Sequence, residues 1–157
     1  MILAHQHILP GQGHSAGRAL LAQLYQQHTG KPMPPIACTN LGKPYFTAGA
    51  LHFSITHTPN HVFCALSDKP IGIDAEELSR VLNPRLAEKL LSPAEYAQYA
   101  AAPDKNRALM TFWVLKEAAG KQTGEGLQLW PNHTVFSLDD PRVTETHGCL
   151  LAVITEE

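Results

Sequence analysis

The clearest pattern in the chain is a two-residue alternation of apolar and polar side chains in its first half. Residues 51–56 alternate in this way, which is the period of a strand with one buried face, and the apolar run at 62–66 repeats the two-residue spacing through Val62, Cys64 and Leu66. Residues 58–60 between them read Thr-Pro-Asn, a sequence typical of turns, so the two segments predict a hairpin. Residues 71–76 predict a further strand, and residues 2–9 predict another.

After the strand predicted at residues 2–9, the apolar residues take the spacing of a helix. Ser15 is suited to cap a helix that runs to about His28 and ends at Gly30. The prolines at positions 32, 34 and 35 then predict an extended connector, because the residue before a proline avoids the helical conformation.

The middle of the chain predicts three helices. The first covers residues 84–91. The second begins at Ser92, because Ser-Pro-Ala-Glu supplies a cap residue, a proline in the first turn and an acid at the third position. Asp104 is suited to cap the third helix, which ends near Gly124.

Two more strands are predicted at the C-terminal end, over residues 133–138 and 148–155. Strands and helices are therefore segregated along the chain rather than alternating. This order favours an α+β fold over a doubly wound parallel sheet. A length of 157 residues fits one domain that spans residues 1–157.

Composition narrows the possible functions. A hydrophobic content of 44% with a net charge of −2 excludes disorder as the main state. The near balance of charges leaves no broad basic surface for a nucleic acid or an anionic membrane. The first residues lack the pattern of a signal peptide, and no apolar run has the length of a membrane span, so a cytoplasmic location is expected.

Cysteines and histidines indicate no metal centre of their own. Cys38, Cys64 and Cys149 are odd in number and far apart, which argues against a disulfide framework and a structural zinc site. The nine histidines show no ligand spacing along the chain. Most of them are expected to be surface residues or to support other groups.

Asp74 and Glu76 are two residues apart on a predicted strand, so both side chains leave the same face. Two nearby carboxylates raise each other's pKa unless positive charge lies between them. Magnesium, which takes one or two carboxylates with substrate phosphates, would supply that charge. The alternative is a solvated pair of acids on an exposed strand.

The third predicted helix carries a stripe of Trp113, Glu117 and Lys121 at a spacing of four residues, with Lys116 beside it. Glu117 and Lys121 by themselves predict no more than an ordinary helical ion pair. A magnesium–diphosphate substrate would explain the whole set: Glu117 would join the two strand carboxylates on the metal, and both lysines would neutralise phosphate charge.

Three further features suit a ligand that carries phosphate. Lys43 lies in a Gly-Lys-Pro turn. Thr56 and His57 end a predicted strand, where hydroxyl and backbone donors can meet an anion. Arg18 lies near the start of the first helix, where the helix dipole favours negative charge.

The order of these segments is similar to that of one enzyme family. The segments are Gly42-Lys43-Pro44, Phe53-Ser54-Ile55-Thr56-His57, Gly72-Ile73-Asp74-Ala75-Glu76, Trp113-Val114-Leu115-Lys116-Glu117-Ala118-Ala119-Gly120-Lys121 and Gly124-Glu125-Gly126-Leu127. Together they resemble the surfactin-synthetase-activating (Sfp) type of 4′-phosphopantetheinyl transferase. The most specific motifs are the Asp-x-Glu after a glycine and the Trp-x-x-Lys-Glu-x-x-x-Lys before Gly-x-Gly-Leu. The resemblance covers residues 42–127 well and residues 18–24 weakly.

This resemblance implies a pseudo-dimer of two α+β lobes. The first lobe would be shortened to about residues 1–70, and the second, about 71–157, would hold the catalytic motifs. The implied reaction moves the phosphopantetheine arm of coenzyme A to a serine of an apo acyl or peptidyl carrier protein. It releases adenosine 3′,5′-bisphosphate and depends on magnesium.

Roles for single residues follow from the same resemblance. Asp74, Glu76 and Glu117 match the magnesium ligands. Glu117 also matches the residue that takes the proton from the carrier serine, and Lys121 matches one that stabilises charge between the α- and β-phosphates. His57 and Arg18 would lie near the 3′-phosphate. With the residues singled out above, the candidate coenzyme A contacts are Arg18, Lys43, Thr56, His57, Lys116 and Lys121.

Three positions call for comment within the family pattern. Glu95 matches an acidic position in the helical segment of the family. Thr56 stands where the family usually has serine, and it retains the hydroxyl. Gly120 weakens a helix by about 1 kcal/mol relative to alanine, which predicts that another segment packs closely against it.

Other functions and partners remain open at this point. A silent module that binds coenzyme A or a carrier protein is one alternative, and a magnesium-dependent diphosphate hydrolase is another. Arg80, Arg85 and Lys89 are suited either to dock an acidic carrier protein or to form a solvated helix face. The chain is expected to act as a monomer.

Overall fold

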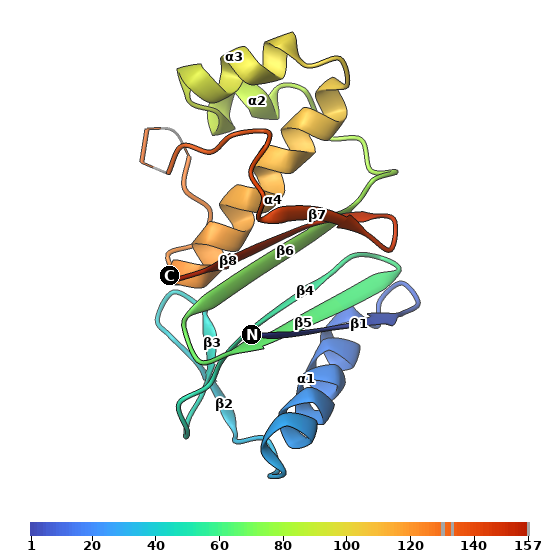
Figure 1. Ribbon diagram of the computed structural model, residues 1–157, viewed down its shortest axis with the longest axis vertical. Coiled ribbons are helices and arrows are strands. Elements are labelled where there is room, and N and C mark those ends of the chain that lie inside the picture. Colours follow the sequence, from blue (N-terminus) through green and yellow to red (C-terminus); the bar gives the residue numbers. More distant parts are fainter. Residues whose placement is uncertain (130, 133, 157) are drawn as a thin grey trace.

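The alternating segments of the first half form an antiparallel sheet of order β1-β5-β4 (Figure 1). In the computed structural model, which describes residues 1–129, 131–132 and 134–156, β4 (His52–His57) and β5 (His61–Ser67) form the predicted hairpin. Strand β1 (Ile2–His7) pairs with the other edge of β5. Helix α1 (Gly13–Thr29) packs its buried side chains on one face of this sheet.

A second antiparallel sheet of order β6-β8-β7 forms from the rest of the chain. Its strands are β6 (Ile71–Glu77), β7 (Val143–Thr146) and β8 (Cys149–Thr155). The three helices are α2 (Leu86–Leu90), α3 (Pro93–Ala101) and α4 (Lys105–Thr123). Helix α4 packs on the second sheet, and α2 and α3 cover the part of α4 farthest from the first sheet (Figure 1).

The two sheets pack against each other in the middle of the molecule, with α1 and α4 on the outside (Figure 1). Phe63 and Ala65 of β5 contact alternate residues of β6, among them Ile71 and Ile73. The intervening residues of β6 face α4. One face of β6 therefore packs against the first sheet, and its other face packs against α4.

Side chains of β4 satisfy the unpaired edge of β6. The hydroxyl of Ser54 accepts a hydrogen bond from the backbone N–H of Ile73 at 3.0 Å, and that of Thr56 accepts from Ala75 at 3.2 Å. Buried backbone N–H groups without partners are costly, and a free strand edge invites pairing with another chain. The two hydroxyls hold the two halves of the chain in register.

A short hairpin of β2 (Ile36–Cys38) and β3 (Pro44–Phe46) was not predicted. The sequence indicated only an extended connector and a Gly-Lys-Pro turn there. The pairing becomes visible only when Phe46 packs in the core of the first sheet, beside Tyr25 and Phe53. This hairpin positions Lys43.

Most predicted helix ends are confirmed. Ser92 and Glu95 form the predicted capping box of α3, Asp104 caps α4, and Gly124 ends α4 in the left-handed conformation. The prediction for Ser15 was wrong: α1 begins two residues earlier, at Gly13, and the Ser15 hydroxyl donates to the carbonyl of Gln12.

The strand predicted over residues 133–138 does not form. Residue 133 lies outside the described residues, and residues 134–138 have no strand conformation. Side chains of α3 accept their backbone hydrogen bonds instead: Glu95 accepts from Phe136 at 2.9 Å and Gln98 from Leu138 at 3.0 Å. Strand β7 was missed, and β8 agrees with the strand predicted at 148–155.

Among the described residues, no helix combines the length and the apolar character needed to cross a membrane.

Candidate functional site

Asp74 is the centre of the candidate site. It lies in β6 with 7% of its surface exposed. Its Oδ1 accepts hydrogen bonds from Thr56 Oγ1 at 3.2 Å and from Lys121 Nζ at 2.9 Å. Its Oδ2 is the only buried side-chain oxygen or nitrogen in the described part of the chain that has no hydrogen-bond partner. A buried carboxylate oxygen in this state leaves one ligand position open for a cation.

Gly72 brings α4 close enough to place Lys121 beside Asp74. A Cβ atom at Gly72 would lie 1.9 Å from the carbonyl oxygen of Ala118 and 2.4 Å from the backbone nitrogen of Gln122. No larger residue fits between β6 and this turn of the helix. The glycine before the Asp-x-Glu motif therefore sets the distance between the strand and the helix.

Glu76 is held by two donors. Trp113 of α4 donates its indole N–H to Glu76 Oε1 at 3.2 Å, and Arg80 forms an ion pair with the same oxygen. The predicted helix stripe therefore does face the Asp-x-Glu motif. Trp113 orients the glutamate as well as filling the interface.

The electrostatics of the cluster favour an added cation. Burial raises the pKa of Asp74 above its ordinary value, against the opposing effect of Lys121. Burial and the negative charge of Asp74 likewise raise the pKa of Glu117. Mutual repulsion of three carboxylates in a partly buried site, and the open oxygen of Asp74, fit a hard divalent cation with oxygen ligands.

Lys43 reaches the same region from the first half of the chain. Its ammonium group donates to the carbonyl of Gln122 near the end of α4, and burial lowers its pKa. A cavity of about 260 Å³ lies between the two halves here, and both Lys43 and Lys121 line it. Two cations at a concave surface suit a phosphate-bearing ligand.

Gly120 of α4 also lines this cavity, and the predicted close packing there is confirmed. A Cβ atom at Gly120 would lie 2.3 Å from the carbonyl oxygen of Gly126. The chain after α4 thus folds back onto the helix at this glycine. Gly120 weakens the helix, but it leaves the space that the Gly-x-Gly-Leu segment needs to pack against α4.

The remaining phosphate candidates of the first half do not share one cavity. His57 lines a separate cavity of about 540 Å³ with Glu76 and Arg80, and its ring packs against Gly13. The Thr56 hydroxyl donates to Asp74 and accepts from the backbone of Ala75, so it positions the carboxylate, and its predicted contact with coenzyme A stays a prediction.

Arg18 lies on α1, next to Gly17, which packs against Ile55 of β4. Among the described residues, Arg18 forms no ion pair or hydrogen bond through its side chain. It lines none of the cavities above, so its predicted contact with a phosphate stays a prediction.

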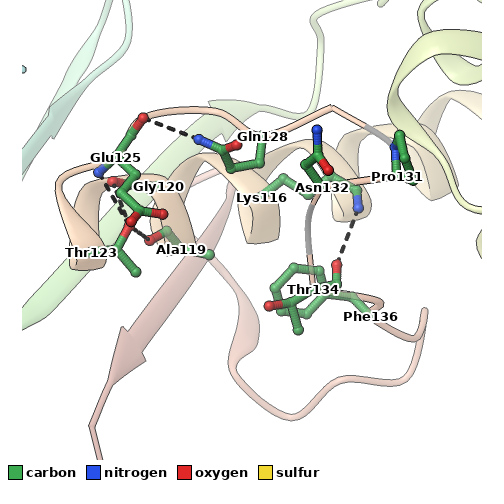
Figure 2. A pocket seen from close by; sticks show the side chains of 10 residues that line it. All are labelled: Lys116, Ala119, Gly120, Thr123, Glu125, Gln128, Pro131, Asn132, Thr134 and Phe136. Carbon is green, nitrogen blue, oxygen red and sulfur yellow. Dashed lines mark hydrogen bonds between the residues drawn. The ribbon is translucent and has the colours of Figure 1, made fainter.

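Lys116 is the one candidate that the structure turns away from the carboxylates. Its side chain is 1% exposed and forms an ion pair at 3.0 Å with Glu95, whose side chain is 0% exposed. Figure 2 shows Lys116 in a different cavity, where its Nζ approaches the carbonyl of Thr134 beside Phe136. Lys116 is offset by one residue from the Glu117 stripe and anchors the segment after α4, and its predicted contact with a phosphate stays a prediction.

Two contributors were missed by sequence reasoning. The Ser54 hydroxyl supports the edge of β6, and Arg80 neutralises Glu76. The alternation of β4 gave a signal for Ser54, because residues 54 and 56 share a face. The pairing of Arg80 with Glu76 depends on the turn that follows β6.

Comparison with known proteins gives the family. Residues 70–152 match the model of the 4′-phosphopantetheinyl transferase superfamily. Since this match covers more than half of the chain, the chain belongs to that superfamily. The family predicted from the motifs is confirmed, and so is the α+β fold class.

Curated relatives carry the same designation. The chain is 38% identical over 91 residues to a 4′-phosphopantetheinyl transferase of Bacillus subtilis, covering 56% of this chain and 40% of the relative. It is 37% identical over 81 residues to the transferase Sfp of Bacillus subtilis (strain 168), covering 50% and 35%. It is 34% identical over 118 residues to the transferase AcpT of Salmonella typhimurium, covering 69% and 57%. The chain therefore matches only part of the length of each relative.

Proposed function

We propose that this protein transfers the 4′-phosphopantetheine arm of coenzyme A to a serine of an apo carrier protein. The observation that carries the proposal is the unpartnered, buried Oδ2 of Asp74 beside Lys121 and Glu117. Family membership and the names of the relatives support the class of reaction.

Asp74, Glu76 and Glu117 would hold a magnesium ion. When bound, magnesium supplies positive charge to the oxygens of the diphosphate. Lys121 would neutralise charge on the same phosphates, and Lys43 would bind a phosphate at the far side of the cavity that both line.

Glu117 is proposed as the general base toward the carrier serine. In the cation-free cluster, burial and the negative charge of Asp74 raise the pKa of Glu117. In the described residues it has no hydrogen bond or ion pair that would occupy its oxygens. The serine oxygen forms the new P–O bond, the diphosphate P–O bond breaks, and adenosine 3′,5′-bisphosphate leaves.

An acidic carrier protein would dock beside this site. Arg85 and Lys89 line a shallow cavity of about 370 Å³ with Val81, which is 80% exposed. An exposed apolar residue between basic groups is typical of a polar-rimmed interface. Arg80, also on this cavity, links it to Glu76.

We further propose that the chain acts as a monomer of two unequal halves, residues 1–70 and 71–157. Contacts within one chain support this: Thr56 reaches Asp74, and Lys43 reaches the end of α4. Light scattering at the concentrations used for assays tests it. A specific activity that falls on dilution, together with the mass of a dimer or trimer, would contradict it. A cytoplasmic location stays a prediction.

Intact-mass measurement distinguishes the candidate functions. The protein is incubated with coenzyme A, magnesium and an apo acyl or peptidyl carrier protein. The proposal predicts that the carrier gains one phosphopantetheine group. Consumption of coenzyme A without a heavier carrier would indicate a diphosphate hydrolase, and binding without any reaction would indicate a silent module.

A further inference from the structure

Strand pairing gathers histidines at the edge of the first sheet that is formed by β1. His7 of β1 stands directly opposite His61 of β5, and His5 stands opposite Phe63. Opposed residues of antiparallel strands point to the same side, so all three imidazoles share the face that carries Phe63. This face is the one that packs against the second sheet.

The three rings are close enough to share one ion. One ring nitrogen from each of His5, His7 and His61 lies within 4.8 Å of the others. His5 Nε2 and His61 Nδ1 are 2.9 Å apart. Zinc–nitrogen bonds of about 2.0–2.1 Å place two ligands of a tetrahedral site about 3.3 Å apart. The arrangement is therefore within small side-chain rotations of a metal site.

A histidine from the second half of the chain packs on the three-histidine cluster. His147, in the turn between β7 and β8, stacks on His5 with ring centroids 3.6 Å apart and an interplanar angle of 13°. Its φ of +51° is the only positive φ of a non-glycine residue in the described chain. This conformation is uncommon outside glycine. With Gly148 at φ +72°, His147 forms the two-residue turn that joins β7 to β8, and this turn sets His147 over the cluster.

The surroundings suit a neutral nitrogen donor set. Burial and the three neighbouring imidazoles lower the pKa of His5 to about 4, so its ring is uncharged at neutral pH. Burial and the neighbouring His7 lower the pKa of His61, against the opposing effect of the Glu77 carboxylate. Cys149 supplies no thiolate, because burial raises its pKa to about 11.

We propose that His5, His7 and His61 bind a zinc-type divalent transition-metal ion at the junction of the two halves, separate from the carboxylate cluster. Imidazole nitrogen suits zinc, copper, nickel and iron, whereas magnesium prefers oxygen ligands. The ion joins the N-terminal strand to β5 beneath the β7–β8 turn. Its binding stabilises the folded chain by an amount that grows with the logarithm of the free metal concentration above the Kd.

Cobalt(II), whose visible absorption reports nitrogen ligands, is the probe. The metal-stripped full-length chain is titrated with Co²⁺ in excess Mg²⁺, which occupies oxygen sites. We expect one Co²⁺ per chain, displacement by Zn²⁺, and a rise in Tm on adding Zn²⁺. His7→Gln and His61→Gln should each weaken binding at least about tenfold and remove the Tm rise.

Two controls locate the signal. His28→Gln changes an exposed histidine outside the cluster, and Asp74→Asn changes the carboxylate site; both should bind Co²⁺ like the unmodified chain. His7 is exposed, so His7→Gln tests the site even if His61→Gln fails to fold. Equal Co²⁺ affinity in the unmodified chain and His7→Gln, or a signal lost in Asp74→Asn, would overturn the proposal.

Discussion

Two groups of ligand-type side chains lie near opposite edges of the first sheet, and they differ in how they are assembled. Beside β4, the carboxylate cluster uses positions two apart on a strand and four apart on a helix. At β1, the histidine cluster joins strands that are more than fifty positions apart in sequence. Local periodicity reveals the first cluster, whereas only strand register reveals the second.

The charge of the two clusters also differs. Burial raises the pKa values of Asp74 and Glu117, and the negative charge of Asp74 adds to the shift at Glu117. His5 avoids a similar cost by staying neutral. The carboxylates thus require a cation for full ionisation, while the imidazoles are stable without one.

The largest expected effect concerns the helix side of the carboxylate cluster. Glu117→Gln and Lys121→Ala should each lower kcat by about 10²–10⁴-fold, because one removes the proposed base and the other a phosphate charge. Steady-state rates of carrier modification measure this. Glu88→Gln and Lys31→Ala, at exposed positions outside the cluster, are matched controls. If Glu117→Gln and Lys121→Ala kept the rate of the unmodified chain, these two residues would form no more than an ordinary helical ion pair.

The second prediction separates Lys116 from the carboxylate cluster. Lys116→Met leaves the buried carboxylate of Glu95 without its cation and should lower the free energy of unfolding by about 3–5 kcal/mol. The double variant with Glu95→Gln should recover part of this loss. Denaturant unfolding measures both. A stable Lys116→Met protein with a raised KM for coenzyme A would restore its interpretation as a phosphate ligand.

A smaller effect is expected at Gly72. Gly72→Ala forces α4 away from β6 and should cost about 1–3 kcal/mol, as overpacking does elsewhere. Because the shift separates Lys121 from Asp74, kcat should fall as well. Gly148→Ala, where no neighbouring atom obstructs a Cβ, tests the general cost of replacing a glycine, although its positive φ adds strain. If only Gly148→Ala lowers kcat, the spacing argument is wrong.

The smallest effect concerns pH. Asp74 and Glu117 have folded-state pKa values above their ordinary ones, so the folded chain binds protons more tightly than the unfolded chain. Without metal, their contribution to stability is greatest below the ordinary carboxyl pKa and is lost as pH rises through the raised values. Asp74→Asn with Glu117→Gln should therefore gain stability relative to the unmodified chain as pH increases. A difference in Tm that does not change with pH would contradict this.

Sequence reasoning predicted the carboxylate cluster more accurately than the residues around it. Spacing placed Asp74 and Glu76 on one face of a strand and Glu117 and Lys121 on one stripe of a helix. A shared magnesium–diphosphate ligand and the family resemblance joined the two groups, and the contact of Asp74 with Lys121 agrees with this. The sequence could not show that Lys116 and Lys121 point to different partners, because the side chain of Lys116 follows the position of Glu95 in the folded chain. The segment at 134–138 has strand-like composition, but side chains of α3 occupy its backbone donors. Such choices depend on tertiary partners that the local pattern does not contain.

The central claim is that Asp74 makes this chain a magnesium-dependent phosphopantetheinyl transferase, and a magnesium titration tests it most directly. The rate of carrier modification is measured against Mg²⁺ for the unmodified chain, for Asp74→Asn and for Asp68→Asn, which changes an exposed aspartate in the turn before β6. We expect saturable Mg²⁺ dependence in the unmodified chain and in Asp68→Asn, and no transfer at any Mg²⁺ concentration in Asp74→Asn. Transfer by Asp74→Asn with the Mg²⁺ dependence of the unmodified chain would contradict the account.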